Sequence, residues 1–338
     1  MKINSEVIFW RRNMNAHNIK RQLLLILATL ICLTTVIAQE KFPSKAVTFV
    51  VPQAPGGAND AIARVIAQKL GELTGQSFVV ENRPGAGGNI GTAYTAKARN
   101  DGYTLLLTAD SAYVINPSLY KNAGFDPLKD FEPISTVATS GYVLVANNNF
   151  PANTTAELIS LAKQQPGKIM IGSAGNGTVN HLVGEMLNKA AGIDLVHVPY
   201  KGASAAVTDL VGGQVQVSVQ SLPSSISFIR SGRIKVLGVV NEKRLAALPN
   251  SIPIQETVPG LSVTPWYGVF APASTPKQVI TQLQTLINQA IDADDVKEKL
   301  ANLGAEPYKL TGDKFSTLIR AELIRWAKTV KDSGASID

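Results

Sequence analysis

Cysteine is almost absent from this chain of 338 residues, with Cys32 as the only example. Cys32 lies close to the N-terminus, so the rest of the chain has no thiol. This excludes a disulfide, a zinc–thiolate site and a cysteine nucleophile from that part. Histidine is scarce as well, because only His181 and His197 follow residue 38. We therefore expect no metal site.

Common catalytic motifs are also missing. The sequence contains no G-x-S-x-G, H-E-x-x-H, C-x-x-C or G-x-x-x-x-G-K-[ST] pattern. The nearest is GSAG at 172–175, which is one residue short of a serine elbow. A hydrolase that uses Ser173 and His181 remains an alternative, although it lacks the third member of a triad. We predict that the chain is not an enzyme, has no catalytic residue and needs no cofactor.

Long apolar runs are limited to the N-terminus. Residues 1–38 contain a basic region, an apolar or threonine run at 23–37, and small residues near position 38. This layout predicts a cleavable secretory signal, with an uncleaved anchor as the alternative. Five basic residues and one acidic residue fall in this segment, so the net charge without it is +3 rather than +7. No stripe of Lys and Arg with interleaved aromatics follows, so no nucleic-acid partner is expected.

Short apolar runs alternate with helical patterns through the rest of the chain. We predict mostly parallel sheets with helices on their faces, and two lobes rather than one oversized domain. The chain is expected to leave the first lobe near residue 140 and to return near residue 250. The predicted division is a signal at 1–38, a first lobe at 39–140 and 251–338, and a second lobe at 141–250.

Two of the predicted strands run into a glycine-rich loop and then into a helix. The loops are PQAPGGAND at 52–60 and GSAGNGT at 172–178. A helix start carries free N–H groups and a partial positive charge, which suits an anion. Gly56 and Gly57 are expected to take positive φ, Asn59 or Asp60 to cap the first helix, and Thr178 to cap the second. Two ordinary strand–helix turns remain the alternative interpretation.

Asp60 needs a separate assignment, because a carboxylate that faced a bound anion would repel it. We therefore predict that Asp60 holds the first loop without touching the ligand. In the second loop, Ser173, Asn176 and Thr178 supply hydrogen-bond donors. A third glycine-rich segment, GAGGNIG at 85–91, has a spacing similar to a nucleotide-phosphate loop. It lies four residues beyond its strand and lacks a clear acidic partner, which favours a turn or a cleft wall.

Seven motifs in order carry a resemblance to a known family from about residue 42 to the C-terminus. They are PQAPGGAND (52–60), ENRPGAGG (81–88), NPSLY (116–120), GSAGNGT followed by HL at 181–182, HVPYKG (197–202), DLVGG (209–213) and WYGVFAP (266–272). The chain resembles the substrate-binding proteins of tripartite tricarboxylate transporters, also called the Bug family of periplasmic solute receptors. The resemblance implies a two-lobed type II periplasmic-binding fold, or Venus flytrap, with a ligand cleft between the lobes.

Family ligands are mostly carboxylates, including di- and tricarboxylates, acidic amino acids and aromatic acids. By resemblance, the first contact loop supplies Gln53, Pro55, Gly56, Gly57, Ala58 and Asn59, and the second supplies Ser173, Asn176, Gly177 and Thr178. Ser111 and Ser221 are further candidates for the cleft wall. One departure concerns Gln53, because the family usually has Phe or Tyr there. An amide in that place is expected to shift the preference toward a more polar acid.

The resemblance implies a periplasmic receptor that captures a small organic carboxylate by lobe closure. It would then deliver the ligand to membrane permease subunits, and a monomer is expected. A secreted α/β enzyme that uses Ser173 and His181, or the loop at 85–91, is an alternative. A ligand sensor for a signalling partner is another, because ligand binding and downstream coupling are separable.

Overall fold

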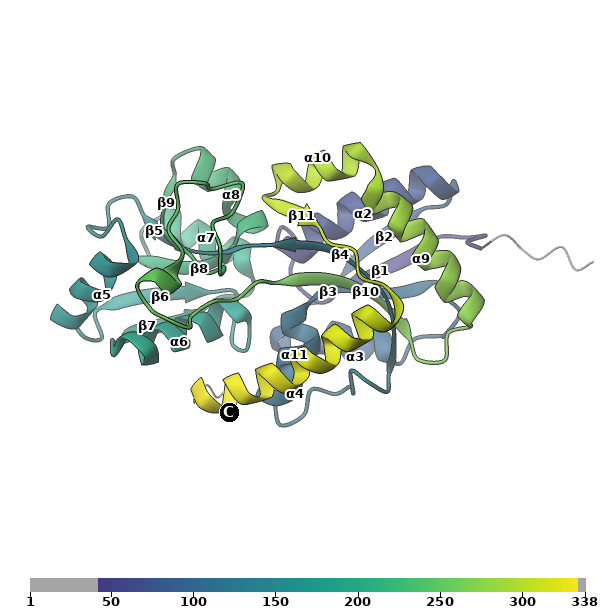
Figure 1. Cartoon of the computed structure of the whole chain (residues 1–338), viewed down its shortest axis with the longest axis horizontal. Coiled ribbons are helices and arrows are strands. Elements are labelled where there is room, and N and C mark those ends of the chain that lie inside the picture. The colour runs from purple at the N-terminus through teal and green to yellow at the C-terminus, as the bar shows by residue number, and fades with distance from the viewer. Residues whose placement is uncertain (1–41, 334–338) are drawn as a thin grey trace, which may run out of the picture. The chain divides into compact units, whose positions relative to one another are not determined.

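The computed structural model describes residues 42–333, and within this range the chain is built around two β-sheets (Figure 1). Helices pack against both sheets, so the fold is an α/β architecture with two lobes. The predicted secretory signal at 1–38, which includes Cys32, lies outside the described residues. No helix within residues 42–333 is long and apolar enough to cross a membrane.

The first lobe contains a six-stranded sheet in the order β11-β4-β10-β3-β1-β2. Strand β1 pairs in parallel with β2 and with β3. The remaining pairs, β3 with β10, β10 with β4 and β4 with β11, are antiparallel. The strands are β1 (Val47–Val51), β2 (Phe78–Asn82), β3 (Thr104–Ala109), β4 (Phe131–Ser140), β10 (Trp266–Pro272) and β11 (Ala305–Pro307).

The second lobe contains a five-stranded sheet in the order β7-β6-β8-β5-β9. Strand β6 pairs in parallel with β7 and β8, whereas β5 pairs antiparallel with β8 and β9. The strands are β5 (Tyr142–Asn147), β6 (Ile169–Ser173), β7 (Leu195–Pro199), β8 (Val217–Ser221) and β9 (Ile234–Val239). Both sheets are thus mixed, and the prediction of mostly parallel sheets is wrong. The antiparallel pairs arise where the chain passes between the lobes, at β4, β5, β9 and β10.

Helices cover both faces of each sheet, as side-chain alternation along the strands requires. In β3, Leu105 and Leu107 pack with residues of α2 and α9. Leu106 points to the other face of the sheet and packs in a separate cluster with residues of α11. The helices of the first lobe are α2 (Ala58–Thr74), α3 (Asn89–Ala96), α4 (Asn116–Leu119), α9 (Lys277–Asp292), α10 (Asp294–Asn302) and α11 (Gly312–Ser333). Those of the second are α5 (Thr155–Gln164), α6 (Val179–Ala191), α7 (Ala203–Val211) and α8 (Leu222–Arg230).

Only Gly141 separates β4 of the first sheet from β5 of the second. A side chain there would collide with Leu245, so the crossing point is closely packed. Asn241 follows β9, where the chain returns to the first lobe, and its side chain contacts both sides of this crossing point. Its Oδ1 accepts from the Tyr142 N–H at 3.0 Å, and its Nδ2 donates to the Ser140 carbonyl at 3.0 Å. Asn241 therefore joins the two strand connections between the lobes.

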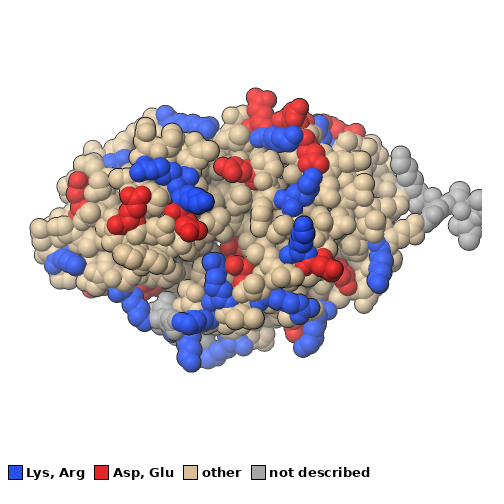
Figure 2. Space-filling view, viewed as in Figure 1, with Lys and Arg blue, Asp and Glu red and all other residues tan. Residues whose placement is uncertain are grey.

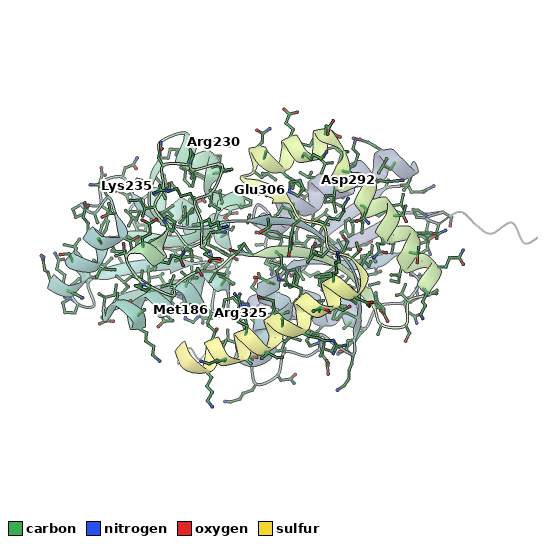
Figure 3. The ribbon with its side chains drawn as sticks, viewed as in Figure 1. Met186, Arg230, Lys235, Asp292, Glu306 and Arg325 are labelled. Atoms are coloured by element: carbon green, nitrogen blue, oxygen red, sulfur yellow. The ribbon has the colours of Figure 1, made fainter. Side chains whose placement is uncertain are left out.

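A contact between helices of the two lobes lies near this crossing. Arg230, at the end of α8, donates through Nη1 to the carbonyl of Asn302 at the end of α10, at 3.0 Å (Figure 3).

Over the face shown in Figure 2, Lys and Arg side chains are interspersed with Asp and Glu.

Candidate ligand-binding site

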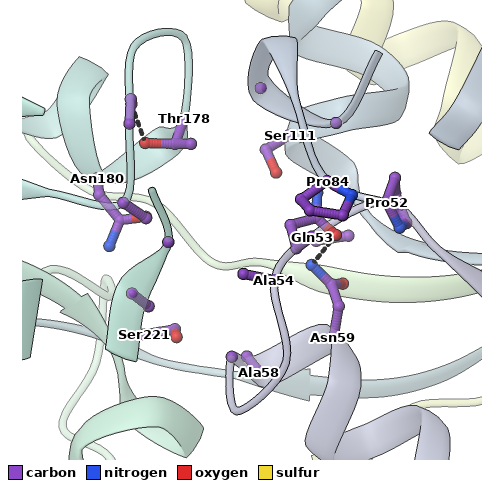
Figure 4. Close-up of a pocket in the computed structure, with 18 of the residues that line it drawn as sticks. Pro52, Gln53, Ala54, Ala58, Asn59, Pro84, Ser111, Thr178, Asn180 and Ser221 are labelled. Atoms are coloured by element: carbon purple, nitrogen blue, oxygen red, sulfur yellow. Dashed lines mark hydrogen bonds between the residues drawn. The ribbon is translucent and has the colours of Figure 1, made fainter. Parts of the chain in front are cut away.

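A cavity of about 490 Å³ lies between the two sheets (Figure 4). In the first lobe it is lined by the segments that follow β1, β2 and β3, and in the second by those that follow β6, β7 and β8. These are the carboxyl ends of six strands that are parallel within each sheet. Open α/β sheets commonly bind ligands at this end of their strands.

Eight of the residues proposed from the sequence line this cavity. They are Gln53, Gly57, Ala58, Asn59, Ser111, Asn176, Thr178 and Ser221. The other four, Pro55, Gly56, Ser173 and Gly177, belong to the same two loops but do not form part of the lining. Ser221 is the last residue of β8 and directly precedes α8.

Several lining residues were not proposed as ligand contacts. The loop at 85–88 forms one wall, in line with its interpretation as a turn or cleft wall rather than a nucleotide loop. Three tyrosines, Tyr120, Tyr142 and Tyr267, come from elements distant in sequence, so no local pattern could have joined them. Tyr200, Lys201, Gly202 and Ala203 follow β7, which is the third strand of the second lobe to end at the cavity. The motifs NPSLY, HVPYKG and WYGVFAP all contributed to the resemblance, yet no site role was drawn from them.

Five helices begin at the wall of the cavity. They are α2, α3, α6, α7 and α8, and each contributes its cap or first-turn residues to the lining. Among the described residues, the backbone N–H groups of Ala58, Asn59, Val179 and Asn180 have no hydrogen-bond acceptor. Free N–H groups at the positive ends of helix dipoles attract anions. The cavity is therefore suited to a negatively charged ligand.

Charged side chains contribute little to this cavity. Lys201 is the one Lys, Arg, Asp or Glu among its lining residues. Within residues 42–333, no cluster of His, Cys, Asp or Glu is arranged to hold a metal ion. An anion in the cavity would accordingly be neutralised by backbone and hydroxyl donors rather than by a basic cluster.

The first loop is held by Asp60, which does not cap the helix. Helix α2 begins at Ala58 with Gly57 as its N-cap, so the prediction of Asn59 or Asp60 as the cap is wrong. Asp60, in the first turn, instead reaches back and accepts from the Gly56 N–H at 3.0 Å. Its carboxylate also accepts from Asn82 Nδ2 at 3.1 Å and pairs with Arg64 at 2.9 Å. Gly56 has φ +78°, whereas Gly57 takes an ordinary φ of −81°.

Burial opposes ionisation of Asp60, but hydrogen bonds from Arg64, the Gly56 N–H and Asn82 outweigh it and lower its pKa. Asp60→Ala is expected to lower the free energy of unfolding by about 1–3 kcal/mol, because three donors lose a buried acceptor. This contribution is present above the ordinary pKa near 4 and is lost as the pH falls through the lowered value. Urea unfolding at pH 7 measures the loss. Arg64→Met, which removes only the more exposed partner, serves as the control and should cost less; equal losses would contradict the assignment.

The second loop is organised by one cap and a pair of histidines. Thr178 caps α6 by accepting from the His181 N–H, which confirms the predicted cap. The Gly177 N–H donates to His181 Nδ1 at 3.3 Å, and the His181 and His197 rings stack at 4.1 Å. The Ser173 hydroxyl lies 2.6 Å from His197 Nε2 and is 1% exposed. Ser173 is therefore engaged in the loop, and its partner is His197 rather than His181.

Both imidazole rings are neutral near pH 7. Burial lowers the pKa of His181, and burial together with the neighbouring His181 lowers the pKa of His197 to about 4. The Ser173 side chain is buried, is bonded to its own loop and to His197, and is not part of the cavity lining. The local geometry thus gives the Ser173 hydroxyl a structural role.

The two lobes touch beside the cavity. Tyr120 follows α4, and its hydroxyl donates to the Asn176 carbonyl in the second loop at 3.1 Å. Ser204 of α7 donates through Oγ to the Pro55 carbonyl at 3.3 Å. These contacts join the first-lobe side of the cavity to the second-lobe side, so the described conformation is closed.

Two lobes, a cavity at the facing strand ends and helix starts directed at it define a solute-binding protein of the periplasmic type. The family model described as "Tripartite tricarboxylate transporter family receptor" matches residues 62–335. The chain belongs to this family, which confirms the resemblance drawn from the motifs. Members are transport receptors that bind solutes and are not enzymes, so the prediction of a non-enzyme is confirmed as well.

Relatives and solved structures agree with this assignment. The chain is 40% identical over 293 residues to a UPF0065 protein of Pseudomonas sp. strain P51, covering 86% of this chain and 87% of the relative. It is 35% identical to protein BugT of Bordetella pertussis, covering 89% of this chain and 93% of BugT. The structure of periplasmic binding protein BugD has a TM-score of 0.84 at 35% identity, covering 87% of this chain and 99% of BugD.

Two further solved structures contain acids. An R. palustris protein solved with adipate has a TM-score of 0.84 at 35% identity, covering 87% of this chain and 99% of that protein. MatC from Rhodopseudomonas palustris with bound malate has a TM-score of 0.79 at 29% identity, covering 86% of this chain and 100% of MatC. These similarities confirm the predicted two-lobed periplasmic-binding fold.

Proposed function

We propose that this protein is a periplasmic receptor that captures a small organic carboxylate between its lobes and delivers it to a membrane permease. The observation that carries the proposal is the convergence of five helix starts on a cavity with one charged lining residue. Membership of the family supports the receptor role, and related proteins solved with adipate and malate support the class of ligand.

Capture follows from the contacts that span the cavity. In an open form, the loop after β1 and the loop after β6 would each expose free N–H groups. A carboxylate held by one loop draws the other over it, because the bonds from Tyr120 to Asn176 and from Ser204 to Pro55 form only on closure. Ligand binding thus shifts the population toward the closed state.

We assign ligand contact to the cavity-lining members of the two loops together with Ser111 and Ser221, and a loop-holding role to Asp60. The domain assignment is a leader at 1–38, a first lobe at 39–140 and 251–338, and a second lobe at 141–250. Strand β4 ends at Ser140 and β5 begins at Tyr142, which supports the first boundary. Export through the leader, action as a monomer and partnership with permease subunits complete the proposal.

A thermal-shift screen against small carboxylates at millimolar concentration tests the proposal. A ligand present at 100 times its Kd adds about 2.7 kcal/mol to the free energy of unfolding. We expect a clear rise in Tm with one acid or with a small set of related acids. Nucleotides and carboxylic esters are the controls. A shift with these compounds and with no free acid would overturn the carboxylate receptor in favour of a secreted enzyme.

A further inference from the structure

Gln53 follows β1, and its half-buried side chain lines the cavity. Its amide is bound to that of Asn59, on the first turn of α2, with Asn59 Nδ2 2.6 Å from Gln53 Oε1 (Figure 4). The Gln53 backbone is fixed too, because its carbonyl accepts from Asn82 Nδ2 at 3.1 Å. Gln53 therefore has both its main chain and one end of its amide held in place.

The burial of Asn59 fixes the direction of this hydrogen bond. Asn59 is 7% exposed, and its Oδ1 is sealed from solvent with no partner among the described residues. If both amides were turned over, the Asn59 NH₂ group would occupy that sealed place with two unpaired donors. A buried carbonyl oxygen without a partner is less costly than a buried donor without one. Asn59 accordingly donates, and Gln53 accepts.

The other end of the Gln53 amide remains available to a ligand. Within residues 42–333, no acceptor bonds to Gln53 Nε2, yet this nitrogen is not among the polar atoms sealed from solvent. Gly88 leaves room for it, since a Cβ at that position would lie 2.8 Å from Nε2. Gly88 also has φ +105°, so a side chain there is disfavoured for two reasons.

We propose that the Gln53 amide, held by Asn59, acts as a donor only and selects ligands that present a hydrogen-bond acceptor to the first lobe. A carboxylate or carbonyl satisfies this donor. An ammonium group would meet another donor, and an alkyl end would leave Nε2 unpaired once the lobes close. The inference rests on the proposed function, and it names the chemistry of the ligand end that faces β1.

The selection is expected to be substantial, because a ligand that fills the closed cavity displaces water from the unpaired donor. A site built to bond a polar group discriminates against an analogue that lacks the group. For one neutral donor we expect a preference of about 10- to 100-fold in Kd.

Three acids with the same chain length test this preference by isothermal titration calorimetry. Adipate ends in an acceptor, 6-aminohexanoate in a donor and hexanoate in an alkyl group; succinate, 4-aminobutanoate and butanoate form the shorter set. In the wild type, the dicarboxylate of the better-fitting set should bind at least about 10-fold more tightly than its two partners. Gln53→Met should bring the Kd of the dicarboxylate close to that of the alkyl acid.

Asn59→Asp gives a sharper test when binding is measured above the pKa of the introduced carboxyl, since ionised aspartate oxygens only accept. Gln53 must then turn its NH₂ group toward residue 59 and present Oε1 to the cavity. We expect the ratio of dicarboxylate to ω-amino acid affinity to fall about 10-fold or more. Asn59→Leu is the uncharged control, which frees Gln53 without reversing it and should produce a smaller fall. Acidic residues are favourable near a helix start, so the aspartate variant is expected to fold.

The outcomes separate this inference from the function on which it rests. Binding of the dicarboxylate with an unchanged preference in Gln53→Met would overturn the role of Gln53 and leave the carboxylate receptor in place. Failure of every carboxylate to bind the wild type would overturn the proposed function itself. If Asn59→Asp melts below the assay temperature, Gln53→Met and Asn59→Leu decide the question alone.

Discussion

Replacing Gly177 with alanine is expected to weaken carboxylate binding by about 30-fold or more while leaving the unliganded fold largely intact. Gly177 has φ +78°, and a Cβ built on it lies 2.6 Å from the Tyr120 hydroxyl oxygen and 2.7 Å from Tyr120 Cε2. Tyr120 belongs to the first lobe and Gly177 to the second. The collision therefore exists only when the lobes are closed, and the substitution penalises the ligand-bound state specifically.

The expected size follows from two costs. Overpacking at a closed contact costs about 1–3 kcal/mol, and displacement of Tyr120 removes its hydrogen bond to the Asn176 carbonyl, which is worth about 1 kcal/mol. Their sum corresponds to about 30- to 1000-fold in Kd. Calorimetry with the acid that gives the largest thermal shift measures the change.

Gly192 provides a matched control. It lies at the C-terminal end of α6 with φ +61°, and a Cβ there meets nothing within 4 Å. Gly192→Ala carries the same left-handed backbone strain, about 1–2 kcal/mol, without the collision. We expect similar Tm losses from the two variants but normal affinity in Gly192→Ala. Tyr120→Ala in the Gly177→Ala background should restore part of the affinity. Equal loss of affinity in both glycine variants would contradict closure as the cause.

The strands that end at the cavity were largely predictable from the sequence. Segments such as 47–51 and 195–198 are short apolar or alternating runs next to loops, so local pattern is sufficient. The two glycine-rich loops were predicted as well, because a loop between a strand and a helix has a distinct composition. The cap at Thr178 follows from its place before an apolar helical face.

The elements that were missed depend on tertiary contacts. Strand β4 contains Pro133 and buried polar side chains such as Ser135 and Thr136, which satisfy their hydrogen bonds locally or with residues far along the chain. Helix α10 buries only Val296 and Leu300 and is mostly polar. Helix α8 begins at Leu222, which is followed by a proline and two serines. Pairing between strands that are far apart in the chain leaves no local pattern, so the mixed pairing of both sheets could not be derived.

The walls of the cavity also depend on contacts that a local sequence pattern does not reveal. The hydrogen bond between Gln53 and Asn59 joins residues six apart, and its direction depends on how deeply Asn59 is buried. Tyr120, Tyr142 and Tyr267 meet because three separate segments converge. The sequence motifs marked these positions as distinctive, but only the fold gives them a place in the site.

The second large effect concerns Asp110, which stands at the end of β3 beside the cavity-lining Ser111. Its carboxyl group is fully buried: Oδ1 accepts from the Ser111 N–H at 2.8 Å, and Oδ2 has no partner among the described residues. Burial and the nearby charge of Glu322 raise the pKa of Asp110 to about 8, against the opposing Ser111 hydrogen bond and the Arg325 charge. Glu322 and Arg325 pair with each other on α11 at 3.0 Å.

The sign of the resulting pH dependence follows from the two states. Below about pH 4 the carboxyl is protonated in both the folded and the unfolded chain. Between about pH 4 and 8 the folded chain keeps a proton that the unfolded chain has released, so stability falls as the pH rises. Above about pH 8 both states are ionised and this contribution becomes constant. With about 1.4 kcal/mol for each unit of pKa shift, the total fall is on the order of 5 kcal/mol.

Asp110→Asn should remove this dependence, because the amide fits the same space, still accepts from the Ser111 N–H and does not titrate. An unpaired NH₂ group in place of Oδ2 subtracts about 1–3 kcal/mol at every pH, so the two proteins should be close in stability near pH 5. By pH 8 the variant should be more stable by a few kcal/mol. Urea unfolding at pH 5, 6.5 and 8 measures the divergence between the wild type and Asp110→Asn. Parallel curves for Asp110→Asn would mean that Asp110 is already ionised in the folded protein, and the unpaired oxygen would then need a cationic partner.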